Sequence, residues 1–330
     1  MKEEDIRPEQ LVRESVPLHA EDLRKLFENK SRFVEVPCPA CEATRHRFEF
    51  DKDGFTFVTC MDCETLFINP RPTAAMLNEF YALSRCVKYR NEKIFPATEG
   101  PRRAEIFAPR AARVVELCRT HGVETRTLLD VGAGYGTFCE EVKKLHVFDS
   151  VVALEPSPDY AETCRRKGIE VIEKPIEDAG VSGVDVLTNF ELIEHLYAPG
   201  DFLASCRQAL AQGGLMILTT PNVKGFDLQV LGRLSDNMCG PYHLNYFHPD
   251  SLGRLLRRRG FEVMEALTPG KLDAELVRKK ILSGAFDASK EPFLRSVLVD
   301  HWETAGRAFQ DFLAESGLSS HLWIVARKVS

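Results

Sequence analysis

The chain of 330 residues has 49 acidic side chains against 43 lysines and arginines, a net charge of -6. This balance disfavours a general nucleic-acid binder, which would usually carry a basic excess. An apolar content of 44% supports a sizeable core. The charged opening MKEEDIRPEQ has no signal-peptide core, and no stretch approaches the ~18 apolar residues of a membrane span, so we expect a cytoplasmic protein with no membrane partner.

Three segments are expected before the main domain. Residues 1–32 are predicted to be a polar leader with a short amphipathic helix near Glu21–Phe27. Residues 33–70 form a cysteine-bearing module. Residues 71–125 are expected to be a helical connector and pocket wall, because residues 73–90 begin after two prolines with a threonine in the capping position.

Four cysteines in the second segment have the spacing of a structural zinc site. Cys38-x-x-Cys41 is followed after 18 residues by Cys60-x-x-Cys63. Each pair forms a tight knuckle, and two knuckles complete a tetrahedron around Zn²⁺ with no open position for catalysis. The alternatives are four unligated thiols or two redox pairs. The spacing favours a zinc ribbon.

Strands and helices alternate from residue 126 to residue 330, which predicts a doubly wound parallel α/β sheet. The strands are expected at Thr127–Val131, Val151–Leu154, Val171–Ile172, Val184–Thr188, Leu215–Thr219, Phe261–Ala266 and Leu322–Ala326. A turn at Gly213-Gly214 is expected to precede the fifth strand. Residues 271–318, between the last two strands, are expected to form a mostly helical insertion.

The stretch LLDVGAGYGTF, residues 128–138, predicts a nucleotide-sized pocket at the carboxyl end of the first strand. The predicted loop residues are Asp130, Gly132, Gly134 and Gly136. Glycine is needed there because a Cβ would block both the tight turn and the approach of a ligand. The dinucleotide fingerprint requires glycine at position 137, where this chain has threonine, so an NAD-dependent oxidoreductase is disfavoured.

An acid two residues before a G-x-G-x-G run resembles motif I of class I methyltransferases that depend on S-adenosylmethionine (SAM). The resemblance implies that the loop faces the amino-acid tail and ribose of SAM. Glu155, which ends the second strand, is expected to accept the ribose hydroxyls. The resemblance places adenine at Ile176 and Glu177. It places the turn from Asn189 to Phe190 under the sulfonium.

Three further stretches, FELIEHL, LAQGGLMILTTPN and HLNYFHPDSLGRLLRRRGFEV, resemble the zinc-ribbon-bearing, ubiquinone-biosynthesis-like methyltransferases. The resemblance covers about residues 33–270. It implies a Rossmann-like, seven-stranded methyltransferase sheet with an N-terminal ribbon and SAM as cofactor. It also implies a small-molecule acceptor, most simply the hydroxyl of a sugar, a nucleotide sugar or another metabolite.

A hydroxyl nucleophile benefits from a general base. The candidates are His243, His195, Tyr246 and Tyr81. Each has a plainer interpretation: His195 as a packed histidine, His243 as a loop residue in water, and the tyrosines as packing residues. Glu191 and His195 at helical spacing suggest a metal pair, but no third ligand is evident. His248 is expected to cap the next helix.

Two other functions stay open. The first is an RNA or protein methyltransferase that docks through the ribbon, which the acidic character of residues 33–70 disfavours. The second is a non-catalytic partner subunit with the SAM fold, against which the intact glycine motif and Glu155 argue. The cations from Arg278 to Lys280 could meet an anionic substrate, or form a solvated helix face.

Overall fold

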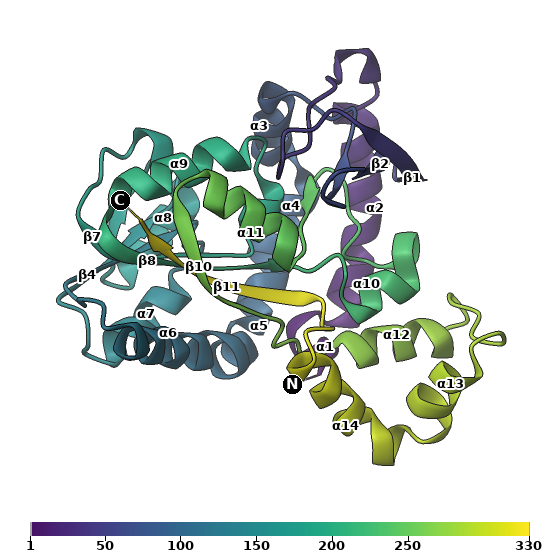
Figure 1. Ribbon diagram of the computed structural model, residues 1–330. Helices are drawn as coiled ribbons and strands as arrows, with labels where there is room; N and C mark the ends of the chain where they lie inside the picture. Colours follow the sequence, from purple (N-terminus) through teal and green to yellow (C-terminus); the bar gives the residue numbers. More distant parts are fainter. Residues whose placement is uncertain (1, 330) are drawn as a thin grey trace. The chain divides into compact units, whose positions relative to one another are not determined.

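The computed structural model describes residues 2–329, and its chain forms two compact units (Figure 1). The sheet unit comprises Glu99–Thr220 and Leu252–Ala266, together with the end of the chain from Trp323. The ribbon unit comprises the chain up to Thr98, Pro221–Ser251 and Leu267–Leu322. No helix in the described part of the chain is long and apolar enough to cross a membrane.

The sheet has seven strands in the order β10-β11-β8-β7-β4-β5-β6. They are β4 (Thr127–Val131), β5 (Ser150–Leu154), β6 (Glu170–Ile172), β7 (Val184–Phe190), β8 (Leu210–Pro221), β10 (Phe261–Leu267) and β11 (His321–Lys328). The pairings β8-β7, β7-β4, β4-β5 and β5-β6 are parallel. Each strand predicted from the sequence lies within an observed strand, so the seven-stranded α/β fold is confirmed.

One predicted turn is wrong. Strand β8 runs unbroken from Leu210 to Pro221, through the two glycines at which we expected a turn before the fifth strand. Gly213 has a φ of 77°, and the register with β7 shifts between Val184 and Val186. A Cβ on Gly214 would lie 3.0 Å from the carbonyl oxygen of Asp185, so glycine there permits a close approach of the two strands.

Helices connect the parallel strands and cover the sheet (Figure 1). They are α6 (Ala108–His121), α7 (Thr137–Lys144), α8 (Pro158–Arg166), α9 (Pro199–Ala209) and α11 (Pro249–Arg258), with the short 3-10 helices η4 (Ile176–Asp178) and η5 (Ile193–His195). The core lies between α6, α7 and the sheet, where Val114, Leu117, Leu128 and Val142 are fully buried. Their burial orients the carboxyl ends of β4 and β5 beside the start of α7.

The ribbon unit contains a four-stranded sheet in the order β1-β2-β3-β9. Its strands are β1 (His46–Lys52), β2 (Phe55–Cys60), β3 (Leu66–Ile68) and β9 (Asn245–Tyr246), all paired antiparallel. The sequence did not indicate β9, which the chain supplies about 180 residues after β3.

The helical leader is longer than predicted. Helix α2 extends over Glu9–Leu26, with Pro17 inside it, after the short helix α1 (Glu3–Ile6). The connector contains α3 (Ala74–Leu83), α4 (Arg85–Tyr89), η2 (Arg90–Ile94), α5 (Phe95–Arg102) and η3 (Arg103–Phe107). The proline hid the length of α2, because proline inside a helical pattern normally marks a break.

The expected helical insertion is present. It consists of α12 (Asp273–Leu282), α13 (Pro292–Arg295), η7 (Ser296–Asp300) and α14 (Trp302–Glu315), next to α10 (Phe226–Leu231) and η6 (Gly232–Leu234). Three of its cations have partners within the ribbon unit: Arg278 lies 4.9 Å over the ring of Trp302, Lys279 pairs with Glu3, and Lys280 pairs with Asp236. These pairings account for the cations without an anionic substrate.

Candidate active site and metal centre

The glycine loop after β4 has the backbone that its sequence predicts. Gly132, Gly134 and Gly136 have φ values of 77°, 53° and 68°, a region that residues with a Cβ rarely adopt. A Cβ on Gly136 would lie 2.6 Å from Cδ1 of Ile169, whereas a Cβ on Gly134 would have no atom within 4 Å. Glycine at 136 is therefore required by internal packing, whereas the space beside Cα of Gly134 is open.

Glu155 lies directly beside this loop. Its carboxylate accepts hydrogen bonds from the backbone N–H of Gly134 at 2.8 Å and of Ser157 at 2.9 Å. Only 6% of the residue is exposed, and this burial raises the pKa of the carboxyl group. The structure thus brings the predicted ribose acid and the glycine loop together, and the contact with ribose stays a prediction.

Asp130 lies beneath the loop. One carboxylate oxygen accepts a hydrogen bond from Oγ1 of Thr188 at 2.7 Å, and the other faces the thiol of Cys139 at 3.6 Å. Burial raises the pKa of Asp130 to about 6. Through these contacts with β7 and α7, Asp130 supports the loop, and its contact with the cofactor stays a prediction.

The next predicted contacts lie at the carboxyl ends of β6 and β7. Ile176 is buried at the start of η4, and the neighbouring Glu177 is exposed. Asn189 is fully buried, and neither its amide oxygen nor its amide nitrogen has a hydrogen-bond partner among the described residues. A buried amide without partners is costly. The end of β7 is therefore a place where a polar ligand would be stabilised.

Arg110, in the first turn of α6, is a site residue that the sequence analysis missed. Its guanidinium carbon lies 4.3 Å from the ring centroid of Phe190, and its Nη2 atom lies 3.9 Å from a carboxylate oxygen of Glu191. Only 8% of the residue is exposed, and burial lowers its pKa. Its guanidinium forms no hydrogen bond within the described chain.

A signal for Arg110 existed in the sequence. Val114 and Leu117 lie four and seven residues further along α6 and are fully buried, so Arg110 is on the apolar face of its helix. A cation on a buried face normally has an anionic partner. The position of Arg110 among the apolar residues of this helix is therefore the signal that marks it.

The segment after β7 carries two glutamates that β8 holds in place. Oγ1 of Thr219 donates to Glu191 at 2.6 Å, and Oγ1 of Thr220 donates to Glu194 at 2.9 Å. Glu191 has a φ of 52°, which is rare for a residue with a side chain. His195 ends η5, and its Nε2 atom lies 3.7 Å from a carboxylate oxygen of Glu194. A catalytic role for His195 stays a prediction.

The other catalytic candidates belong to the ribbon unit. The fully buried Tyr246 donates its hydroxyl proton to the carbonyl of Asn237 at 3.1 Å and accepts from the N–H of Cys239 at 3.0 Å. This hydroxyl therefore fastens a loop. Nδ1 of His243 forms a hydrogen bond with the same carbonyl oxygen of Asn237, at 3.0 Å. Tyr81 is 41% exposed on α3. His243 and Tyr81 remain predicted site residues.

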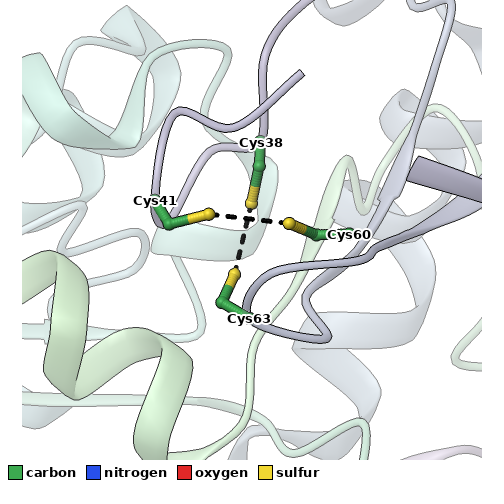
Figure 2. A group of neighbouring side chains, drawn as sticks. All are labelled: Cys38, Cys41, Cys60 and Cys63. Atoms are coloured by element: carbon green, nitrogen blue, oxygen red, sulfur yellow. Dashed lines mark hydrogen bonds between the residues drawn. The ribbon is translucent and has the colours of Figure 1, made fainter. Parts of the chain in front are cut away.

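The four predicted metal ligands converge on one point (Figure 2). The Sγ atoms of Cys38 and Cys63 are 3.5 Å apart, as are those of Cys41 and Cys60, and all four lie within 4.8 Å of one another. A tetrahedron with Zn–S bonds of ~2.3 Å has edges of about 3.8 Å. The sulfur positions therefore fit a zinc ion with four thiolate ligands.

The two knuckles have the same backbone. In each, the residue after the second cysteine has a positive φ, 65° at Glu42 and 57° at Glu64. In each, its N–H donates to the carbonyl of the first cysteine, at 2.9 Å to Cys38 and 3.0 Å to Cys60. This repetition indicates that both C-x-x-C-E stretches are shaped for the same task.

Residues 102–266, 165 of the 330 residues, match the sequence family described as a methyltransferase domain. The chain belongs to this family. The match contains Arg110, the glycine loop, Glu155 and Asn189. The methyltransferase domain thus covers the part of the chain where the sequence predicted SAM binding.

Similar proteins carry methyltransferase names. A Mycolicibacterium smegmatis protein named a probable S-adenosylmethionine-dependent methyltransferase is 30% identical over 44% of this chain and 56% of its own length. A ubiquinone biosynthesis O-methyltransferase of Caulobacter sp. is 34% identical over 29% of this chain and 40% of its own. The chain thus spans about half the length of the curated relatives it matches.

Solved structures are also similar. A crystal structure of a S-adenosylmethionine-dependent methyltransferase from Clostridium acetobutylicum gives a TM-score of 0.46 at 9% identity. The likeness covers 69% of this chain and 94% of that one.

Proposed function

We propose that the protein binds SAM at the carboxyl ends of β4, β5 and β7 and transfers its methyl group to a small-molecule hydroxyl. The observation that carries the proposal is a pair of buried polar side chains at these strand ends that form no hydrogen bond with the described residues. They are the amide of Asn189 and the guanidinium of Arg110, whose one ion pair, with Glu191, is long at 3.9 Å. Beside them, no atom lies within 4 Å of where a Cβ on Gly134 would stand.

Three side chains of the proposed site each suit one part of SAM. Glu155 can accept the ribose hydroxyls, as an acid at this position does in dinucleotide folds. Arg110 can donate a bidentate pair of hydrogen bonds to the carboxylate of the methionine tail. The side chain of Ile176 offers an apolar surface to adenine. SAM, when bound, supplies an activated methyl group on sulfur.

The residues of this chain would act chiefly by positioning. Methyl transfer is an in-line displacement, and the alignment of a nucleophile can supply a large part of the rate enhancement. A base would take the proton of an acceptor hydroxyl, and His243 and His195 stay the candidates for this role. The name of the Caulobacter relative supports oxygen as the acceptor atom. A sugar hydroxyl is a narrower possibility within that class.

Calorimetry with SAM and its demethylated product tests the cofactor proposal. We expect a tight one-to-one complex for the native protein and about a 100-fold loss of SAM affinity in Arg110→Met, because a charge-assisted pair is lost. Arg119→Met is the matched control, since Arg119 is an exposed residue of the same helix. Binding of NADH in place of SAM, or equal affinity in both variants, would contradict the proposal.

We also propose that the four cysteines hold a structural zinc ion. With four protein ligands the metal keeps no open position, so its role would be to fold the ribbon. Elemental analysis of protein purified without chelator should give about one zinc per chain. Cys60→Ser should lower that ratio severalfold, whereas the buried Cys118, which lies on α6, should tolerate replacement by alanine without loss of metal.

A further inference from the structure

We propose that His248 is a positioning residue that joins the second cysteine knuckle to the loop of residues 222–248 between β8 and α11. Through this link, a metal held by the four cysteines would keep His243 in its orientation. The inference rests on the zinc site proposed above. Every contact that carries it lies within the ribbon unit.

The first link is a direct hydrogen bond to a ligand residue. Nε2 of His248 lies 2.9 Å from the carbonyl oxygen of Cys63. A carbonyl oxygen only accepts, so Nε2 must carry the proton. We expected His248 to cap the next helix. It does precede α11, but only 3% of it is exposed, and its side chain is directed to the knuckle instead.

The second link is the pairing of β3 with β9. Strand β3 begins at Leu66, three residues after Cys63, and Leu66 pairs with Tyr246. The N–H of Ile68 donates to the carbonyl of Leu244 at 3.0 Å. Since so few residues separate the knuckle from β3, the shape of the knuckle fixes where β3 lies and thereby where β9 lies.

Strand β9 in turn sets the orientation of His243. The hydroxyl of Tyr246 bonds both the carbonyl of Asn237 and the N–H of Cys239. Nδ1 of the His243 ring bonds the same Asn237 carbonyl, and the backbone N–H of His243 donates to the carbonyl of Cys239 at 3.0 Å. Hydrogen bonds, joined by short stretches of the chain itself, thus lead from Cys63 to His243.

Metal binding should strengthen this series. Without metal, only contacts between thiols could join the two knuckles directly, and thiols are weak hydrogen-bond partners. Metal–thiolate bonds contribute folding free energy to the segment that carries them. Because coupling between two sites is reciprocal, loosening the loop should also weaken the hold on the metal.

The test combines metal content, metal release to a chromogenic chelator, and hydrogen exchange of residues 237–247. It compares the native protein, zinc-depleted protein and three variants. His248→Ala removes the donor, His248→Gln can restore one, and Lys224→Ala is the control. Lys224 lies on the same loop and pairs with Glu64, but both side chains of that pair are largely exposed, so it should contribute little.

We expect zinc depletion to speed exchange in residues 237–247 at least tenfold and to leave β4 unchanged. His248→Ala should speed both exchange and zinc release about tenfold, the order expected when a buried acceptor loses its donor. His248→Gln should restore most of both, and Lys224→Ala should match the native protein. Absence of zinc would defeat the metal site itself. If zinc is bound, but neither its removal nor His248→Ala speeds exchange in residues 237–247, this inference alone is overturned.

Discussion

Replacing Asp227 with asparagine should stabilise the protein above neutral pH. Asp227 is 1% exposed in α10, and its carboxylate lies near Ser320 and Asp273 without a well-formed hydrogen bond to either. Burial, and after it the nearby charge of Asp273, raise the pKa of Asp227 from 3.8 to about 7. At pH 8 the native fold must therefore hold a charge that its surroundings disfavour.

The direction of the pH effect follows from this shift. A carboxyl group whose pKa is raised on folding binds its proton more tightly in the folded state. Its contribution to stability is complete below about pH 4 and is lost as the pH rises through about 7. Three pKa units correspond to roughly 4 kcal/mol, an upper bound for one buried group. Asparagine keeps the shape and carries no charge, so it should remove this loss.

Urea unfolding at pH 5 and pH 8 measures the effect. The free energy of unfolding should fall less between these pH values in Asp227→Asn than in the native protein. Asp273→Asn is the contrast: Asp273 accepts hydrogen bonds from Oγ of Ser319 at 2.7 Å and from Nε2 of Gln310 at 2.8 Å. It should destabilise at both pH values. A variant Asp227→Asn that is less stable than the native protein at pH 8 would refute the account.

Local sequence signals determined most of the sheet unit. Parallel strands such as Val151–Leu154 are continuous apolar segments, because both faces of the sheet are covered. The glycines after β4 mark a backbone that other residues rarely adopt. The C-x-x-C pairs likewise specify their own knuckles. In each case, the residues that form the sequence pattern also form the local structure.

What the sequence could not show depends on residues that are distant along the chain. Strand β9 is two residues long, and it is a strand only because β3 offers an edge. The buried state of Asp227 depends on α12, which follows some forty residues later. Tyr246 is among the base candidates in the sequence, but its buried hydroxyl bonds the backbone of Asn237 and Cys239.

Replacing Gly136 with alanine should destabilise the protein and abolish SAM binding together. Its Cβ would lie 2.6 Å from Cδ1 of Ile169 and 2.8 Å from Sγ of Cys164, and both side chains are buried. Overpacking of this kind costs about 1–3 kcal/mol. The positive φ of 68° adds about 1–2 kcal/mol for a residue with a Cβ. Thermal unfolding and calorimetry with SAM measure the two losses.

Gly134→Ala separates ligand approach from stability. Its Cβ would have no atom within 4 Å, so we expect only the backbone cost of about 1–2 kcal/mol. Gly122→Ala is the matched control, because Gly122 has a φ of 61°, equally open surroundings, and a place at the end of α6 away from the loop. Both variants should unfold at similar temperatures, but only Gly134→Ala should lose SAM affinity, by tenfold or more. If the two variants bind SAM equally, the open space beside Cα of Gly134 does not face the cofactor, and the glycine loop has a structural role alone.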